Sequence, residues 1–284
     1  MSRTVFVNGA YLPEDEARVS VFDRGFLFAD GVYEVVSVLD GKLIDFAGHM
    51  ARLRRSLGEL AMAMPMEEAE FLAMHRALVE RNGLGEGMVY TQVTRGAADR
   101  DFAFPPATTP PTVVAFTQAA PLVDRPSARD GIRVITMPDI RWSRRDIKTV
   151  QLLAPSLAKM AAKRAGVDDA WLVEDGVVTE GTSNNAYIVA GGEIITRDLS
   201  ASILHGITRA AILRLAGEAQ MRLVERPFTI EEAKAADEAF ITSASTFVTP
   251  VIEIDGLPIG VGAPGPVAAR LREIYIADAR ATAV

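Results

Sequence analysis

The stretch RRDIKTVQLL, residues 144–153, contains Lys148, one of only five lysines in the 284-residue chain. Its neighbours Ile147 and Thr149 are β-branched, which favours a strand, and the leucines at 152 and 153 are expected in a core. The other four lysines have ordinary surface contexts: one follows an Asp-Gly turn, two lie four apart on an expected helix, and one lies in an acidic run. Lys148 is therefore the lysine whose position calls for a functional explanation.

The composition around this stretch is that of an ordinary globular protein. Apolar residues make up 49% and charged residues 24%, and the length is comfortable for two domains. The net charge of −7 does not favour binding to nucleic acid or to an anionic membrane. Cysteine is absent and the three histidines lack metal-ligand spacing, so we expect no metal site. With neither a secretory signal nor a membrane-spanning run, the sequence favours a cytoplasmic protein.

Hairpin and helix signals alternate along the chain. Asp-Gly dipeptides at 40–41, 175–176 and 255–256 each join two apolar runs, which predicts β-hairpins. Helical periodicity is found in residues 46–62, 154–166, 206–220 and 266–281. The pattern predicts an α+β protein with mixed or antiparallel sheets in two domains. We expect an N-terminal domain over 1–118, a linker over 119–130, and a C-terminal domain over 131–284 that carries Lys148.

Two segments have the features of phosphate-binding sites. In ILHGITRAA, residues 203–211, an apolar run meets Gly206 and a helix begins, so the backbone N–H groups of Ile207 and Thr208 are free to bind an anion. In ITSASTFVTP, residues 241–250, small hydroxyl residues follow a strand-like start. The alternatives are a plain helix cap and a solvated turn. GLGEG, residues 83–87, precedes a strand and is interpreted as a turn, not a dinucleotide site.

Glu180 adds a candidate carboxylate to Lys148 and the two phosphate-binding segments. In TEGTSNNAYIV, residues 179–189, Glu180 precedes a glycine between two expected strands; the alternative is a turn glutamate. A lysine can form a Schiff base with an aldehyde, and a carboxylate can pair with a pyridinium nitrogen. With two phosphate-binding segments, these are the parts that a pyridoxal phosphate enzyme requires.

The same segments resemble the fold-type IV pyridoxal phosphate transaminases, in particular their D-amino-acid branch. The resembling segments occur in family order: DRGFLFADGVYEVV (23–36), HMARL (49–53), VYTQVTRG (89–96), DIRWSRRDIKTVQLL (139–153), VTEGTSNNAYIV (178–189), ILHGITR (203–209) and TSASTFVTPVIEIDG (242–256). The resemblance implies transfer of an amino group from a D-amino acid such as D-alanine to a 2-oxo acid. It also implies a homodimer with active sites near the subunit interface.

The resemblance implies a role for each matching residue. Lys148 would carry pyridoxal 5′-phosphate as a Schiff base and act as the catalytic base, and Glu180 would pair with the pyridinium nitrogen. Residues implied to bind the phosphate or the ring are Arg52, Leu204, Ile207, Thr208, Ser245 and Thr246. Tyr33 and Arg100 would hold the substrate carboxylate, with the loop of Arg100 reaching the partner's site.

One position departs from the pattern. The D-amino-acid branch usually has a histidine two residues after the loop arginine, where this chain has Phe102. The change keeps an (R)-selective amine transaminase open as an alternative, beside a branched-chain L-amino-acid transaminase and, least favoured, an aminodeoxychorismate lyase. A catalytically silent binding scaffold is the alternative from a different class.

Overall fold

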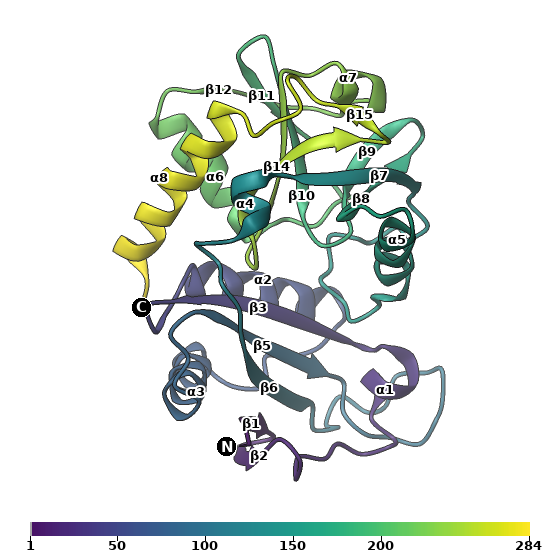
Figure 1. Ribbon diagram of the computed structural model, residues 1–284. Helices are drawn as coiled ribbons and strands as arrows, with labels where there is room; N and C mark the ends of the chain where they lie inside the picture. Colours follow the sequence, from purple (N-terminus) through teal and green to yellow (C-terminus); the bar gives the residue numbers. More distant parts are fainter. Residues whose placement is uncertain (1) are drawn as a thin grey trace. The chain divides into compact units, whose positions relative to one another are not determined.

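The computed structural model describes residues 2–284, which form two compact units (Figure 1). The first unit comprises residues 2–121, 147–151 and 282–284, and the second comprises 122–146 and 152–281. Both units combine helices with a sheet, and the expectation of an α+β protein with antiparallel and mixed sheets is confirmed.

The first unit contains a six-stranded antiparallel sheet in the order β2-β1-β6-β5-β3-β4. Its strands and helices are β1 (Thr4–Val7), β2 (Ala10–Pro13), α1 (Arg24–Phe28), β3 (Gly31–Leu39), β4 (Lys42–Leu43), α2 (Phe46–Glu59), α3 (Glu68–Arg81), β5 (Gly87–Thr94) and β6 (Thr112–Ala119). The helices α2 and α3 pack against the sheet and bury an apolar core that includes Met50, Leu53 and Leu57 of α2. These three residues have the helical spacing on which the helix was expected.

The second unit contains a nine-stranded mixed sheet in the order β12-β11-β10-β13-β14-β7-β8-β9, with β15 paired to β14. Its elements are α4 (Pro126–Asp130), β7 (Ile132–Pro138), α5 (Leu153–Arg164), β8 (Asp169–Glu174), β9 (Val177–Gly181), β10 (Asn185–Ala190), β11 (Glu193–Thr196), α6 (Ile207–Glu218), β12 (Arg222–Glu225), α7 (Ile230–Lys234), β13 (Glu238–Ser243), β14 (Phe247–Ile254), β15 (Leu257–Pro258) and α8 (Pro266–Thr282). The strands β7 and β8 run parallel to each other, and β7 runs parallel to β14.

The three Asp-Gly dipeptides form the turns of β3–β4, β8–β9 and β14–β15. Each aspartate has a φ of 50–53° and each following glycine a φ of 74–78°. Two successive positive φ angles are the requirement of a type I′ turn, so the hairpin predictions are confirmed at all three sites.

Lys148 belongs to the first unit, although its residue number lies within the 131–284 range expected for the C-terminal domain. The reason is backbone pairing with the start of β3. The N–H of Tyr33 donates to the Lys148 carbonyl at 3.0 Å, the N–H of Val150 donates to the Gly31 carbonyl at 3.1 Å, and Val32 forms a bridge with Thr149.

The expectation that Leu152 and Leu153 lie in a core is wrong. Their side chains are 39% and 74% exposed. The chain turns into α5 at this point, and the face of α5 that packs against β8 carries the small residues Ala158 and Ala162. The leucines therefore project from the other side of the helix start.

Candidate functional site

One group of candidate site residues surrounds Lys148 in the first unit. The Lys148 Nζ lies 4.3 Å from the centre of the Tyr33 ring, which itself stacks on Tyr90 at 5.4 Å between ring centres. The Lys148 N–H donates to the Ser56 hydroxyl at 3.4 Å, one turn after Arg52 on α2. The structure thus brings Lys148, Tyr33 and the α2 helix of Arg52 together in one unit.

Arg52 is held by a buried carboxylate, Glu34. Its Nε donates to Oε1 at 2.8 Å and its Nη2 to Oε2 at 2.7 Å, while the His49 ring nitrogen Nδ1 lies 2.7 Å from Oε2. Glu34 has no exposed surface, and burial alone would raise the pKa of its carboxyl. The charge and hydrogen bonds of Arg52, with those of His49, more than offset burial and lower this pKa to about 2.

The sequence reasoning overlooked Glu34 and His49. The signal was available, because Glu34 interrupts the alternation of Val32, Val36 and Val38, which are all fully buried on one face of β3. A carboxylate at such a position needs a cationic partner. His49 and Arg52, three apart on α2, are where that partner is found.

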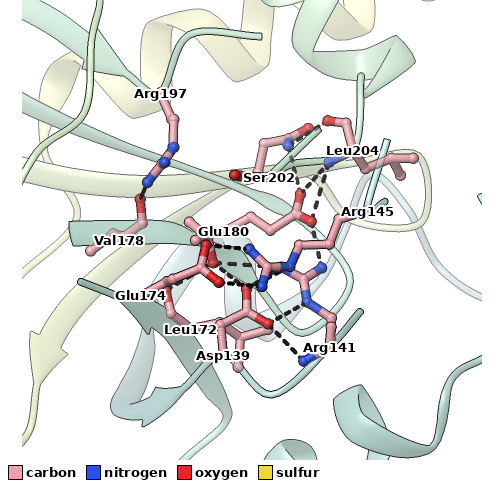
Figure 2. Close-up of polar contacts among 12 residues, drawn as sticks. Asp139, Arg141, Arg145, Leu172, Glu174, Val178, Glu180, Arg197, Ser202 and Leu204 are labelled. Atoms are coloured by element: carbon pink, nitrogen blue, oxygen red, sulfur yellow. Dashed lines mark hydrogen bonds and ion pairs between the residues drawn. The ribbon is translucent and has the colours of Figure 1, made fainter. Parts of the chain in front are cut away.

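A separate group of candidate residues surrounds Glu180, at the end of β9 in the second unit (Figure 2). Its Oε1 accepts from Arg141 Nη1 at 2.5 Å, and its Oε2 accepts from Asn185 Nδ2 at 3.0 Å. The Leu204 N–H donates to both oxygens at 3.2 Å. Burial raises the pKa of Glu180, and the charge and hydrogen bond of Arg141 oppose that rise.

Arg141 is held in turn by Asp139. The Nε and Nη2 of Arg141 donate to the two Asp139 oxygens at 2.9 and 2.6 Å, and the Thr179 hydroxyl donates to Asp139 at 2.7 Å. Burial lowers the pKa of Arg141, but the hydrogen bonds and charges of Asp139 and Glu180 more than offset this, so the pKa is raised and the guanidinium stays charged. Asp139, Arg141 and Asn185 were not identified from the sequence. In the case of Arg141, the arginine-rich segment 141–145 has the composition of a solvated surface.

The helix start at Gly206 lies next to the Glu180 network. Gly206 is the N-cap of α6 and no side chain caps the first turn, which begins with Ile207 and the buried Thr208. A Cβ atom at Gly206 would lie 2.1 Å from Asn185 Oδ1, so only glycine fits there. The Asn185 amide nitrogen also donates to the Leu204 carbonyl at 3.0 Å, and so ties the segment before the helix to Glu180.

The hydroxyl-rich turn between β13 and β14 is the last component of the second unit. Ser243 Oγ lies 2.8 Å from Thr246 Oγ1 and 3.3 Å from Ser245 Oγ. Arg125 Nη1 donates to the Ser245 carbonyl at 2.6 Å, and the buried Arg272 donates to the Thr246 carbonyl at 2.8 Å. Two guanidinium groups therefore support this turn through its backbone, a role that the sequence did not indicate.

Arg100 lies among aromatic rings. Its guanidinium carbon is 5.4 Å from the centre of the Phe28 ring and 5.5 Å from that of Phe102, whose side chain is 80% exposed. Within the described part of the first unit, the contacts of Arg100 do not join it to Tyr33. The structure therefore groups Tyr33 and Lys148 but places Arg100 in a different, exposed cluster.

Clusters of metal-ligating side chains and membrane-spanning helices are both absent among residues 2–284. Among residues 2–284, no three His, Cys, Asp or Glu side chains gather as a metal site would require. No helix in this range combines the length and the apolar content needed to cross a membrane.

Comparisons with known proteins agree on one family. The sequence profile described as amino-transferase class IV matches residues 31–254. The D-alanine aminotransferase of Staphylococcus aureus (strain N315) is 39% identical over 271 residues, 95% of each chain. The D-alanine aminotransferase of Bacillus licheniformis is 40% identical over 262 residues, 92% of each chain.

Solved structures show the same architecture. The branched-chain aminotransferase of the archaeon Thermoproteus uzoniensis, solved with norvaline, superimposes with a TM-score of 0.86 at 26% identity, over 97% of this chain and 94% of that one. The Escherichia coli branched-chain amino acid aminotransferase superimposes with a TM-score of 0.89 over 98% and 94% of the two chains. At 23% identity, the latter shows the fold alone.

Proposed function

Because the chain belongs to the class IV aminotransferases, we propose that it transfers the amino group of a D-amino acid such as D-alanine to a 2-oxo acid, with pyridoxal 5′-phosphate as its cofactor. Relatives named D-alanine aminotransferase, 38–40% identical over most of the chain, support the D-amino acid as donor. The two branched-chain enzymes described above are less similar in sequence, at 26% and 23% identity.

The observation that carries the proposal is Glu180, a buried carboxylate with three fixed donors at the end of a strand. Such a group fits the ring nitrogen of the cofactor, because an anion stabilises a protonated pyridine. When bound, pyridoxal phosphate supplies an aldehyde that receives the amino group and a ring that withdraws electrons from the substrate.

We assign the remaining parts of the cofactor to other residues of the chain. The phosphate would be held by Arg52, by the N–H groups of Ile207 and Thr208 at the start of α6, and by the hydroxyls of Ser245 and Thr246. A helix start with no side-chain cap and a hydroxyl turn supported by arginines both favour an anion. Leu204 would pack against the ring face.

Lys148 would bind the cofactor covalently through Nζ and, once released, move a proton from the substrate's α-carbon. A lysine accepts a proton as a base only when its amine is neutral. The contact of Nζ with the Tyr33 ring places the amine on an aromatic surface and limits the directions it can take. Tyr33 and Arg100 would hold the substrate carboxylate.

We include a homodimer in the proposal, with Arg100 acting in the partner's site. In this chain the Arg100 guanidinium lies near the rings of Phe28 and Phe102. These contacts do not join it to the site residues of its own unit, which supports a role for its loop in the partner's site. Phe102, in place of a histidine, removes a hydrogen-bond donor and adds an apolar ring. This substitution favours an (R)-selective amine transaminase as the second candidate function.

Activity of the purified protein with three donors against one 2-oxo acid tests the proposal. D-alanine should be the best donor, ahead of (R)-1-phenylethylamine and L-leucine. Lys148→Ala should lower turnover by several orders of magnitude and remove the visible absorption of covalently bound cofactor. Comparable turnover of D-alanine by this variant would refute the role of Lys148, and a preference for either other donor would refute the D-amino-acid assignment.

A further inference from the structure

Arg141 lies between two carboxylates of the second unit (Figure 2). Asp139 takes up one edge of its guanidinium with two hydrogen bonds, and the remaining nitrogen, Nη1, donates to Glu180 at 2.5 Å. Asp139 has no exposed side-chain surface, and the Arg141 side chain is 13% exposed. Because the guanidinium is planar and two of its nitrogens are bound to Asp139, the direction in which Nη1 donates to Glu180 is fixed.

We propose that Arg141 is a positioning residue for Glu180: it keeps this carboxylate an anion and fixes one of its oxygens, so that the proton between Glu180 and the cofactor's ring nitrogen stays on the ring. The inference rests on the proposed function, in which Glu180 faces that nitrogen.

The charges around Glu180 explain why a cation is needed. The other two donors, the Asn185 amide and the Leu204 N–H, are neutral, and Asp139 adds a second negative charge that raises the pKa of Glu180 further. Burial raises it as well. Among the described contacts of Glu180, Arg141 supplies the positive charge that opposes both effects.

The consequence concerns one proton. Without Arg141, a buried Glu180 next to Asp139 has a higher proton affinity, and it takes up the proton from the ring nitrogen. The pair then consists of a neutral acid and a neutral ring, and the ring withdraws electrons less well. A purely structural role for Arg141 would not move this proton.

The network provides a matched control. Arg145 donates to both oxygens of Glu174 at 2.7 and 2.6 Å and lies 3.5 Å from Asp139, but its described contacts do not include Glu180. Glu174→Gln therefore disrupts an ion pair of the same network without touching Glu180. Arg141→Lys is the conservative variant, because it retains a cation that can reach the same carboxylate.

The experiment is ¹⁵N NMR of the purified protein loaded with pyridoxal phosphate labelled at the ring nitrogen. Wild type, Arg141→Lys and Glu174→Gln should show the resonance of a protonated pyridine. Arg141→Gln should shift it toward the value of the unprotonated ring, and Arg141→Met serves as a second neutral variant in case the first does not fold. Equilibrium binding gives a second readout, the ratio of the affinity for pyridoxal phosphate to the affinity for its analogue with CH in place of the ring nitrogen. In the same neutral variants this ratio should be at least tenfold lower than in wild type.

The outcomes separate two failures. If the wild type binds the cofactor with an unprotonated ring, or does not bind it, the role of Glu180 in the proposed function fails and this inference fails with it. If the wild-type ring is protonated and both neutral variants keep the same resonance and the same preference, the proposed function stands and the role of Arg141 is refuted.

Discussion

Glu34→Gln should destabilise the protein by about 3 kcal/mol, although it changes no atom that would touch the cofactor. The variant keeps the size of the side chain and removes the charge that holds Arg52 with two hydrogen bonds and His49 with one. The carboxyl pKa falls from 4.5 to about 2 in the folded protein, and each pKa unit corresponds to about 1.4 kcal/mol. Because Glu34 has no exposed surface, solvent screening does not reduce this value.

The sign of the pH dependence follows from the lowered pKa. The contribution of the Glu34 charge is complete above pH 4.5 and is lost as the pH falls toward about 2. Wild type and variant should therefore be unfolded with denaturant, without added cofactor, over a range of pH. The difference between their free energies of unfolding should be constant at neutral pH and should shrink below pH 4.5. Glu14→Gln, which disrupts the exposed pair with Arg3, is the matched control and should hardly move the midpoint. Equal unfolding free energies for wild type and Glu34→Gln at pH 7 would refute the reasoning.

Three further predictions concern single residues. Arg52→Lys should lose cofactor on dialysis and regain activity with excess pyridoxal phosphate, because lysine cannot reproduce the two-point contact with Glu34 or a bidentate phosphate contact; retention equal to wild type would contradict this. Arg100→Ala should raise the KM for D-alanine about tenfold, because the substrate carboxylate loses a charged hydrogen bond. The KM for (R)-1-phenylethylamine, which has no carboxylate, should stay unchanged. If the loop acts in the partner's site, mixing this variant with Lys148→Ala should restore activity, and no recovery after verified subunit exchange would reject that arrangement. Burial lowers the pKa of His75 to about 4, so stability should fall as the pH drops from 6.5 to 4, and His75→Gln should flatten that part of the curve measured by thermal unfolding.

Local patterns were sufficient for much of the fold. The Asp-Gly dipeptides specified three turns through their own φ angles, and the spacing of Met50, Leu53 and Leu57 specified α2 and its buried face. The two-leucine prediction failed for a related reason. An apolar pair such as Leu152 and Leu153 is suited to burial, but the sequence does not show which face of the helix will be buried. The structure shows that α5 packs through Ala158 and Ala162, on a different face.

The charged partners of the candidate site were less accessible to sequence reasoning. Glu180 could be selected because a glycine and a polar cluster follow it, but Arg141 meets it only after β7 and β9 have been placed in one sheet. Glu34 and Arg52 similarly meet through the packing of α2 on β3. Hydrogen bonds between residues far apart in sequence are set by strand order and register, which a single sequence does not provide.

The pairing of residues 147–151 with the start of β3 has a consequence for how the chain is made. During synthesis, the first unit's segment 1–121 leaves the ribosome well before the lysine that pairs with it, and the whole of 122–146, which belongs to the other unit, comes between. A fragment ending at residue 121 would therefore lack the segment that pairs with Gly31–Tyr33 and should bind a synthetic peptide of residues 144–153 in its place. Lys148 is thus made after residues 2–121 of its unit and before residues 282–284, so it can pair with the start of β3 only after chain elongation has passed it.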